Sequence, residues 1–492
     1  MTAHRSDTKY LYHEDDRNPH QIRSIVRREL ANLLFAVHGA LDAEEEYAVE
    51  FVNNVNLFLD NFGLRRDRED LSQRAQQAAG DAGSGKWYLA RSNLGEQLFS
   101  AGRYRKAAQV FEEVLAGLGE TLSYEGSFTL LWLGRCLKFQ GHAAQAAEQY
   151  RRGLATAEKL EQSDGVKRHM GLLNTDLGDV LTDMGDYDGA KTAYESALAI
   201  DEEIGGDPRG TAVTKGQLGT LAMLQGNLQE AAQRYLDALG TFRQLNEPES
   251  EAIIWHQLGR VHQEAEQWDA AEQAYRQSAQ IEESQGNLKG AAASWGNLAV
   301  VAQLAGKPDE AETWYRKAID GLKASGDTAN ASKMLNNLAN LLQTHYPQRL
   351  PEARHLAEEA LAIDKTLDPG AAEIWKNYTL MAQIAEKQKD TEQAKEYRRL
   401  AREARQNFMG TAHQLKQHEQ WMVAVIAAVK GNEEAKEFVK QTQQAMRQED
   451  WSLVADAIDQ ILAGERDEDA LCEKLHYDGA LVISAILAGL SD

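Results

Sequence analysis

Residues 80–86 have the glycine and lysine spacing of a phosphate-binding loop. They read Gly-Asp-Ala-Gly-Ser-Gly-Lys, so backbone N–H groups and the Lys86 ammonium would be the phosphate ligands. The motif also requires Ser or Thr after the lysine, to bind magnesium, and a buried strand before the first glycine. Here Trp87 follows the lysine, and residues 73–79 are polar and helical in pattern. We therefore expect a flexible linker and no nucleotide site.

The histidines and cysteines do not form a recognisable catalytic or metal-binding set. His413 and His418 are five residues apart, off one helical face, and no cysteine or carboxylate completes a zinc ligand set. Cys136 and Cys472 lie far apart in apolar helical contexts, without zinc spacing or a histidine at a catalytic spacing. We expect no metal, no cofactor and no enzymatic activity. Free cysteines are typical of a reducing compartment, so we predict a cytoplasmic protein.

The strongest pattern is a repeated frame of small and aromatic residues. In its clearest copies, which begin at Gly178 and Gly219, a second glycine follows after seven residues, an alanine after twelve and a tyrosine after sixteen. Weaker copies keep part of the frame. The anchor positions recur about every 40 residues, and a period of this size indicates stacked supersecondary units. The anchors are Gly95, Gly134, Gly178, Gly219, Gly259, Ala299, Ala339 and Ala382.

Each copy of the frame predicts two helices. Apolar residues around Leu218 recur at helical spacing, and this first helix (helix A) ends at Gly226, because glycine accepts a positive φ without steric penalty. A second helix (helix B) then carries Ala231 and Tyr235 on one face. One such hairpin cannot bury its apolar face alone, so the copies must stack.

This pattern resembles the tetratricopeptide repeat over residues 86–408, in a variety with a longer period than the standard 34 residues, similar to kinesin light chains and bacterial signalling arrays. The resemblance implies an all-α fold: a right-handed superhelix, or α-solenoid, of about eight hairpins with helical caps. We expect a mobile tail at 1–17, an N-terminal helical cap at 18–80 and a C-terminal helical domain at 409–492. Asp42 and Glu45 have capping-box spacing and predict the start of the second cap helix.

In arrays of this family, helix A lines the concave groove, notably at the position two before the anchor. Five of the eight residues at that position are side-chain amides, which offer both a donor and an acceptor to a peptide backbone. The resemblance therefore implies an extended partner segment in the groove, whereas the alternative is that these amides only bridge neighbouring helices or hold water. The series is Asn93, Trp132, Asp176, Gln217, Gln257, Asn297, Asn337 and Leu380.

Charged and polar residues add candidate partner contacts. Arg135 and Arg260 follow two anchors, and either could bind a partner's carboxylate. Asp176 lies in an acidic patch that suits a basic side chain. We expect a polar, basic end of the groove, formed by Lys333, Asn336, Asn337, Asn340 and Lys376. Ser92 and Glu96 occupy positions where some family members carry Asn and Lys to grip a C-terminal carboxylate, so that mode of binding is not expected.

Two further features leave alternatives open. Phe128, Leu131, Trp132 and Phe139, with Phe99 beside them, would either anchor a partner or pack against the 18–80 helices. The stretch 345–351, which adds two residues to the seventh repeat, is either a tolerated insertion or a projecting contact loop.

The overall charge limits the classes of partner. The chain has 492 residues with 53 basic and 76 acidic side chains, a formal net charge of −23. This balance disfavours nucleic acid and anionic membrane surfaces as partners. The acid excess either keeps a convex face solvated or docks a basic partner. The apolar runs 422–429 and 480–490 are too short to span a bilayer.

These observations predict a non-enzymatic adaptor that binds a protein or peptide in the concave groove. The alternative is a regulatory sensor subunit of a bacterial signalling or defence system, whose superhelix responds to a peptide or small ligand and controls a partner enzyme. The C-terminal helical domain would hold a second partner, or a second copy of the chain in a homo-oligomer.

Overall fold

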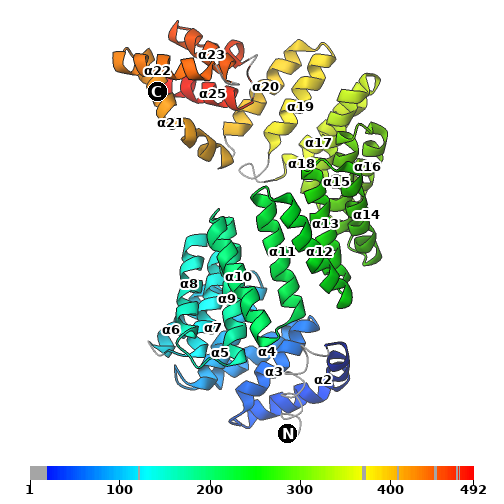
Figure 1. Ribbon diagram of the computed structural model, residues 1–492, viewed down its shortest axis with the longest axis vertical. Coiled ribbons are helices and arrows are strands. Elements are labelled where there is room, and N and C mark those ends of the chain that lie inside the picture. The colour runs from blue at the N-terminus through cyan, green and yellow to red at the C-terminus, as the bar shows by residue number, and fades with distance from the viewer. Residues whose placement is uncertain are drawn as a thin grey trace. The chain divides into compact units, whose positions relative to one another are not determined.

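The computed structural model describes residues 19–119, 122–367, 373–406, 409–447, 451–472, 475 and 477–491. Over these ranges the regular elements are α-helices α2–α25 and one 3₁₀-helix, η1, without any strand (Figure 1). The predicted all-α fold is confirmed. The tail expected at 1–17 lies outside the described residues. None of the helices in these ranges has the length and apolar character needed to cross a bilayer.

Three helices precede the repeats: α2 (Pro19–Asp42), α3 (Ala48–Asn61) and α4 (Arg65–Gln77). They bury two apolar clusters, and the larger of these includes Phe51 and Leu71 and extends to Ala90 of the next helix. The predicted capping box is wrong. Asp42 ends α2 and pairs with Arg74 of α4, and α3 begins only at Ala48, after a turn. The Asp42 carboxylate is thus used between helices instead of at a helix start.

The chain forms two compact units, residues 1–246 and 247–492, and each is described here by itself. After α2–α4, the first unit contains four A/B hairpins. These are α5 (Gly85–Ser100) with α6 (Tyr104–Leu118), α7 (Tyr124–Phe139) with α8 (Ala143–Ala157), α9 (Asp164–Asp183) with α10 (Tyr187–Ile204), and α11 (Pro208–Leu224) with α12 (Leu228–Gln244).

The second unit contains four more hairpins and a C-terminal helical group. The hairpins are α13 (Pro248–Glu264) with α14 (Trp268–Ser284), α15 (Leu288–Leu304) with α16 (Pro308–Ala324), α17 (Thr328–His345) with α18 (Leu350–Asp364), and α19 (Ile374–Lys387) with α20 (Thr391–Gln406). The short helix η1 (Pro347–Arg349) lies between α17 and α18. The C-terminal group is α21 (Met409–Val429), α22 (Glu433–Met446), α23 (Ser452–Leu462), α24 (Glu468–Cys472) and α25 (Tyr477–Ser491).

The repeated glycine and tyrosine positions explain the close packing of each hairpin. The Tyr194 ring, which is 2% exposed, lies so close to Gly178 that a Cβ there would be 2.6 Å from a ring carbon. The turn glycine Gly185 has a φ of +79°, a conformation that other residues rarely adopt. The frame therefore encodes both the turn and the space for the ring. Equivalent buried tyrosines are Tyr150, Tyr235, Tyr275 and Tyr315.

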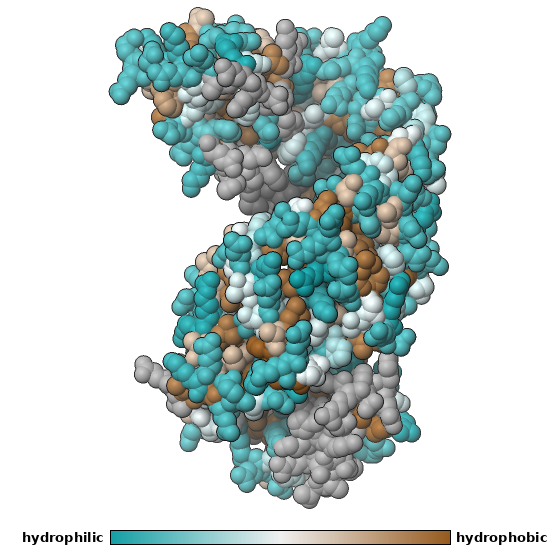
Figure 2. Space-filling view, in the orientation of Figure 1, coloured by the Kyte–Doolittle hydropathy of each residue, from teal (hydrophilic) through white to brown (hydrophobic). Residues whose placement is uncertain are grey.

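The A helices form the inner layer of the stack in the first unit. Each B helix packs against the next A helix, and successive A helices also contact one another, as α5 with α7, α7 with α9 and α9 with α11. Successive B helices have no comparably extensive contact in the part of the unit that the structure describes. Closer spacing on the A side bends the stack toward that side. Figure 2 shows mostly hydrophilic side chains on the visible surface, in keeping with the acidic composition.

The A-helix face as a candidate partner-binding surface

The A helices of successive hairpins present one side of the stack, which is termed the A-helix face. In the first unit, this face contains a charged pair that joins two repeats. Arg135 Nε lies 2.5 Å from Asp176 Oδ2, which links α7 to α9, and the Arg135 guanidinium lies 5.0 Å from the centre of the Trp132 ring. One helical turn further on, Lys138 Nζ lies 2.9 Å from Asp179 Oδ2 and forms a second link between α7 and α9. Arg135 and Asp176, both candidate partner contacts, therefore contact each other.

Burial shifts the pKa of two carboxyl groups on this face. Burial raises the pKa of Asp176, although the Arg135 charge beside it acts in the opposite direction. Burial also raises the pKa of Glu96 on α5 to about 7, with Arg68 and Arg135 opposing the shift. Glu96 was not among the predicted contacts. It directly follows the Gly95 anchor, as Arg135 and Arg260 follow theirs, and this position could have identified it as a candidate.

Asn93 and Trp132 hold equivalent positions on α5 and α7, and each has a buried N–H donor. Asn93 Nδ2 and Trp132 Nε1 have no hydrogen-bond partner among the described residues. A buried donor without a partner costs about 1–3 kcal/mol, so such groups are uncommon in native proteins. Gln217, the next amide of this unit, is half-buried on α11 and makes no side-chain hydrogen bond to the described chain.

The aromatic residues beside this face pack mainly with one another. Phe99 lies 5.3 Å from both the Trp132 and the Phe139 ring centres. Phe99 and Trp132 pack on a core cluster of α6 and α7, which is separate from the cluster of the 18–80 helices. Leu131 is buried, whereas Phe139 is 57% exposed and stacks on Tyr104. Phe139 is thus an open apolar side chain on this unit.

In the second unit, Asn297 bridges two A helices. Its Nδ2 lies 3.2 Å from His256 Nε2 on α13, and His256 Nδ1 lies 3.1 Å from Ser294 Oγ. Burial lowers the pKa of His256 to about 4, with Arg260 adding to the shift, so the ring is neutral at physiological pH. Asn297 therefore has the bridging role that was the alternative to peptide binding.

Three other predicted residues also have partners within the chain. Gln257 Oε1 accepts from Arg260 Nη1 at 3.1 Å, on the same helix. Asn340 Oδ1 accepts from Gln343 Nε2 at 3.0 Å. Lys376 is exposed and lies 2.6 Å from Glu373.

One face of α17 carries polar groups that the rest of the described chain leaves unbonded. Lys333 is exposed, Asn336 and Asn337 are half-buried, and none of the three side chains makes a hydrogen bond or ion pair to the described residues. Their spacing of three and four puts them on one side of the helix, together with Asn340. Free amides beside a free ammonium can accept and donate to an extended chain, with a preference for acidic residues.

The insertion at 345–351 packs against α16 of the preceding repeat and against α18 of its own repeat. Tyr346 donates a hydrogen bond to Asp309, and Arg349 lies 2.7 Å from Glu312 and 2.8 Å from Glu352. The hydrogen bonds from Arg349 hold the pKa of Glu312 at about 2. These contacts favour a structural role for the insertion over a projecting loop.

The segment 80–86 joins two helices. Helix α4 precedes it where a phosphate-binding loop would have a strand, and Gly85 and Lys86 already belong to α5. Ser84 caps α5, since its Oγ accepts from the Trp87 N–H at 3.2 Å. Within the described ranges, no three His, Cys or acidic side chains cluster to hold a metal ion. Both cysteines are buried and neither forms a disulfide within the described chain, and burial raises the pKa of Cys136 to about 12.

Comparisons with known proteins agree with this architecture. A family model for the tetratricopeptide repeat matches residues 170–244, 210–284 and 290–366. The apo form of the quorum sensor NprR from B. thuringiensis has 15% sequence identity and a TM-score of 0.50, and the match covers 77% of this chain and 99% of that one. No curated protein matched the chain by sequence.

A second solved structure has a similar fold. It is a signal transduction ATPase with numerous domains, with a tetratricopeptide repeat sensor, from Pyrococcus horikoshii, at 15% identity and a TM-score of 0.52. The match covers 70% of this chain and 52% of that one. At these identities the likeness concerns the fold alone. The family match shows that residues 170–284 and 290–366 consist of tetratricopeptide repeats, and the hairpins on either side of this stretch have the same A/B form.

Proposed function

We propose that the chain is a non-enzymatic adaptor that binds an extended segment of a partner protein along its A-helix face. The observation that carries the proposal is the α17 face, where Lys333, Asn336 and Asn337 have no bond to the described chain. Half-buried amides have already lost part of their contact with water, so a peptide backbone that pairs with them restores hydrogen bonds at a small further desolvation cost.

The strength of these contacts limits what they can do alone. Two amides at about 0.5–1.5 kcal/mol each, and one charge-assisted bond at about 1.5–3 kcal/mol, contribute only a few kcal/mol. Micromolar affinity requires about 8 kcal/mol, after the cost of ordering the peptide. The partner must therefore bring apolar side chains as well. We expect a segment with acidic residues for Lys333 and at least one apolar anchor.

The test compares variants of α17 in a pull-down from the native host, quantified by mass spectrometry. Lys333→Ala combined with Asn337→Ala should lower the retention of partner proteins at least about tenfold. Lys395→Ala is the matched control, because Lys395 is an exposed lysine of the same unit on a B helix. Partner retention that is equal in the α17 variant and the control would refute the proposal.

Asn297→Ala distinguishes binding from bridging. It removes the contact to His256, so it should lower the thermal midpoint, whereas Asn337→Ala should leave that midpoint nearly unchanged. A large loss of stability in Asn337→Ala would assign Asn337 a structural role and count against its role in binding.

A sensor is the second candidate. The two structural relatives described above are named as a quorum sensor and a sensor-containing ATPase. The repeat array of this chain is divided between two compact units at residues 246 and 247. A sensor should change its dimensions on ligand binding, whereas an adaptor should keep them. Small-angle scattering with and without a captured partner peptide separates the two.

A further inference from the structure

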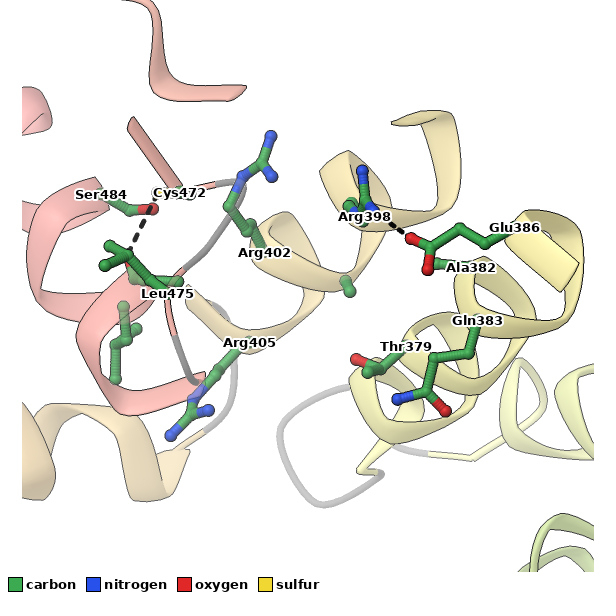
Figure 3. Close-up of a pocket in the computed structure, with 13 residues that line it drawn as sticks. Thr379, Ala382, Gln383, Glu386, Arg398, Arg402, Arg405, Cys472, Leu475 and Ser484 are labelled. Atoms are coloured by element: carbon green, nitrogen blue, oxygen red, sulfur yellow. Dashed lines mark hydrogen bonds and ion pairs between the residues drawn. The ribbon is translucent and has the colours of Figure 1, made fainter. Parts of the chain in front are cut away.

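A cavity of about 270 Å³ lies between α19, α20, Cys472 of α24, Leu475 and α25 (Figure 3). The described part of its lining includes three arginines from one face of α20: Arg398, Arg402 and Arg405. Their spacing of four and three places them along the same side of the helix. Glu386, on α19, is the one carboxylate among the described lining residues. Glu468 and Asp478, which pair with Arg402 and Arg405, are not among the described lining residues.

The three arginines differ in how firmly they are held. Arg405 is 7% exposed, lies 2.8 Å from Asp478 and has its guanidinium 4.9 Å from the Trp375 ring centre. Arg402 is 15% exposed, and its Nε lies 3.2 Å from Glu468. Arg398 is 37% exposed and pairs with Glu386, which is 42% exposed, as Figure 3 shows.

The Arg398–Glu386 pair is the replaceable contact. An ion pair exposed to this degree contributes only about 0–1 kcal/mol, because water screens it and two long side chains must be ordered. An anion that enters the cavity can therefore take the place of Glu386 at little cost. The deeper arginines are fixed by contacts on other elements, so their charges are pre-organised for the incoming group.

The rest of the described lining is largely apolar. The C-terminal part of the lining includes Leu481. Leu475 and Ser484, which adds a hydroxyl group, belong to the same part and are labelled in Figure 3. The volume is slightly below the range of about 300–1,000 Å³ that is usual for drug-sized ligands. This combination suits a small molecule with one anionic head group and a compact apolar body.

We propose that this cavity binds a small organic anion. Arg398 and Arg402 hold its carboxylate or phosphate group, and Leu475 and Leu481 contact its apolar part. None of the unbonded α17 residues Lys333, Asn336 and Asn337 is among the described lining residues, and the site does not depend on the proposed adaptor function. Carboxylate and phosphate both match the planar guanidinium donors.

Calorimetric titration of the full-length chain tests the site. The probes are benzoate and phenyl phosphate, with benzyl alcohol as the uncharged control. We expect one or both anions to bind and the alcohol not to bind. The tighter of the two anions identifies the head group. Equal heats from all three probes, or none from either anion, would overturn the proposal.

Three variants assign the binding to this cavity. Arg398→Gln should weaken anion binding at least about tenfold. Arg399→Gln, the neighbouring arginine that pairs with Glu396 and Glu403 outside the cavity, should leave it unchanged. Glu386→Gln should tighten binding severalfold, because it removes the carboxylate that competes for Arg398.

All three substituted side chains are partly exposed, so the three variants should fold normally. A thermal melt of each variant checks this. Equal weakening of anion binding by Arg398→Gln and Arg399→Gln would mean that the anions bind through non-specific electrostatic attraction. Weaker binding by Glu386→Gln would show that this carboxylate supports the ligand instead of competing with it. Either result overturns the proposed site.

Discussion

Gly178→Ala should destabilise the chain, although alanine is a better helix former than glycine. Gly178 lies within α9, where the substitution alone would gain about 1 kcal/mol from helix propensity. The new Cβ, however, would lie 2.6 Å from Tyr194 Cε1 and 2.8 Å from two more ring carbons. Ordinary contacts begin at about 3.4 Å, and a fully buried ring has little space into which it can move.

The expected net change follows from these two effects. Overpacking of this kind typically costs about 1–3 kcal/mol. Because three ring carbons are contacted, the cost should lie toward the upper end and exceed the propensity gain, which leaves a net loss of about 1–2 kcal/mol. Gly240→Ala is the matched control. Gly240 lies within α12 of the same unit and is exposed, and a Cβ added there would have no neighbouring atom within 4 Å, so the substitution should gain about 0.5–1 kcal/mol.

Thermal melts followed by circular dichroism give the sign of each change. A double-mutant cycle adds a stronger test, because Tyr194→Ala removes the ring that creates the clash. On that background, Gly178→Ala should become stabilising. If Gly178→Ala stabilises the native chain as much as Gly240→Ala does, the anchor glycine is not required by the ring and our account of the repeat frame is wrong.

Three further predictions concern buried and paired side chains. Burial raises the pKa of Glu96 to about 7 from 4.5, so its contribution to stability is full below pH 4.5 and is lost as pH rises through 7. Glu96→Gln should therefore raise the free energy of unfolding at pH 8 by up to about 3 kcal/mol, and the thermal midpoint should rise with it. Near pH 4 the substitution should leave both unchanged. Arg349→Ala should lower the thermal midpoint at pH 7 by a small amount. The effect should shrink in melts below pH 4.5, because Arg349 lowers the pKa of Glu312 to about 2 and the stability gained from this shift is lost as pH falls from 4.5 toward 2. Ser127→Ala should cost about 1–3 kcal/mol in urea unfolding, since Ser127 Oγ and the buried His169 Nε2 lie 2.8 Å apart.

The periodic sequence was sufficient to predict the hairpins. Turn glycines and anchor glycines act within one hairpin, so their spacing reports local geometry that a neighbouring repeat does not alter. The cap was less predictable. Asp42 and Glu45 have the spacing of a helix start, but Arg74, 32 residues away, binds the Asp42 carboxylate and α3 begins later. A local signal of about 1 kcal/mol can be outweighed by such a tertiary contact.

The candidate site was only partly predictable, for the same reason. The amide positions follow from the repeat frame, but their availability depends on side chains of the preceding repeat, as for Asn297, or of the same helix, as for Gln257. Asn297 is engaged by His256, 41 residues away, whereas Asn337 makes no such contact within the described chain. Sequence reasoning also missed the arginines of α20. Their helical spacing was visible, but the cavity forms only where Leu475 and residues of α25 pack near that helix.

The sequence alone determined the all-α hairpin architecture, because the 40-residue frame specifies turns and buried faces by local spacing. The tertiary structure alone decided how the bridging contact of Asn297 forms and where the arginines of α20 line a cavity. The physical reason is that these properties depend on contacts between residues far apart in the sequence, such as Asn297 with His256, 41 residues away, and Arg405 with Asp478, 73 residues away. Helical periodicity in the sequence does not indicate which of these distant residues will pair.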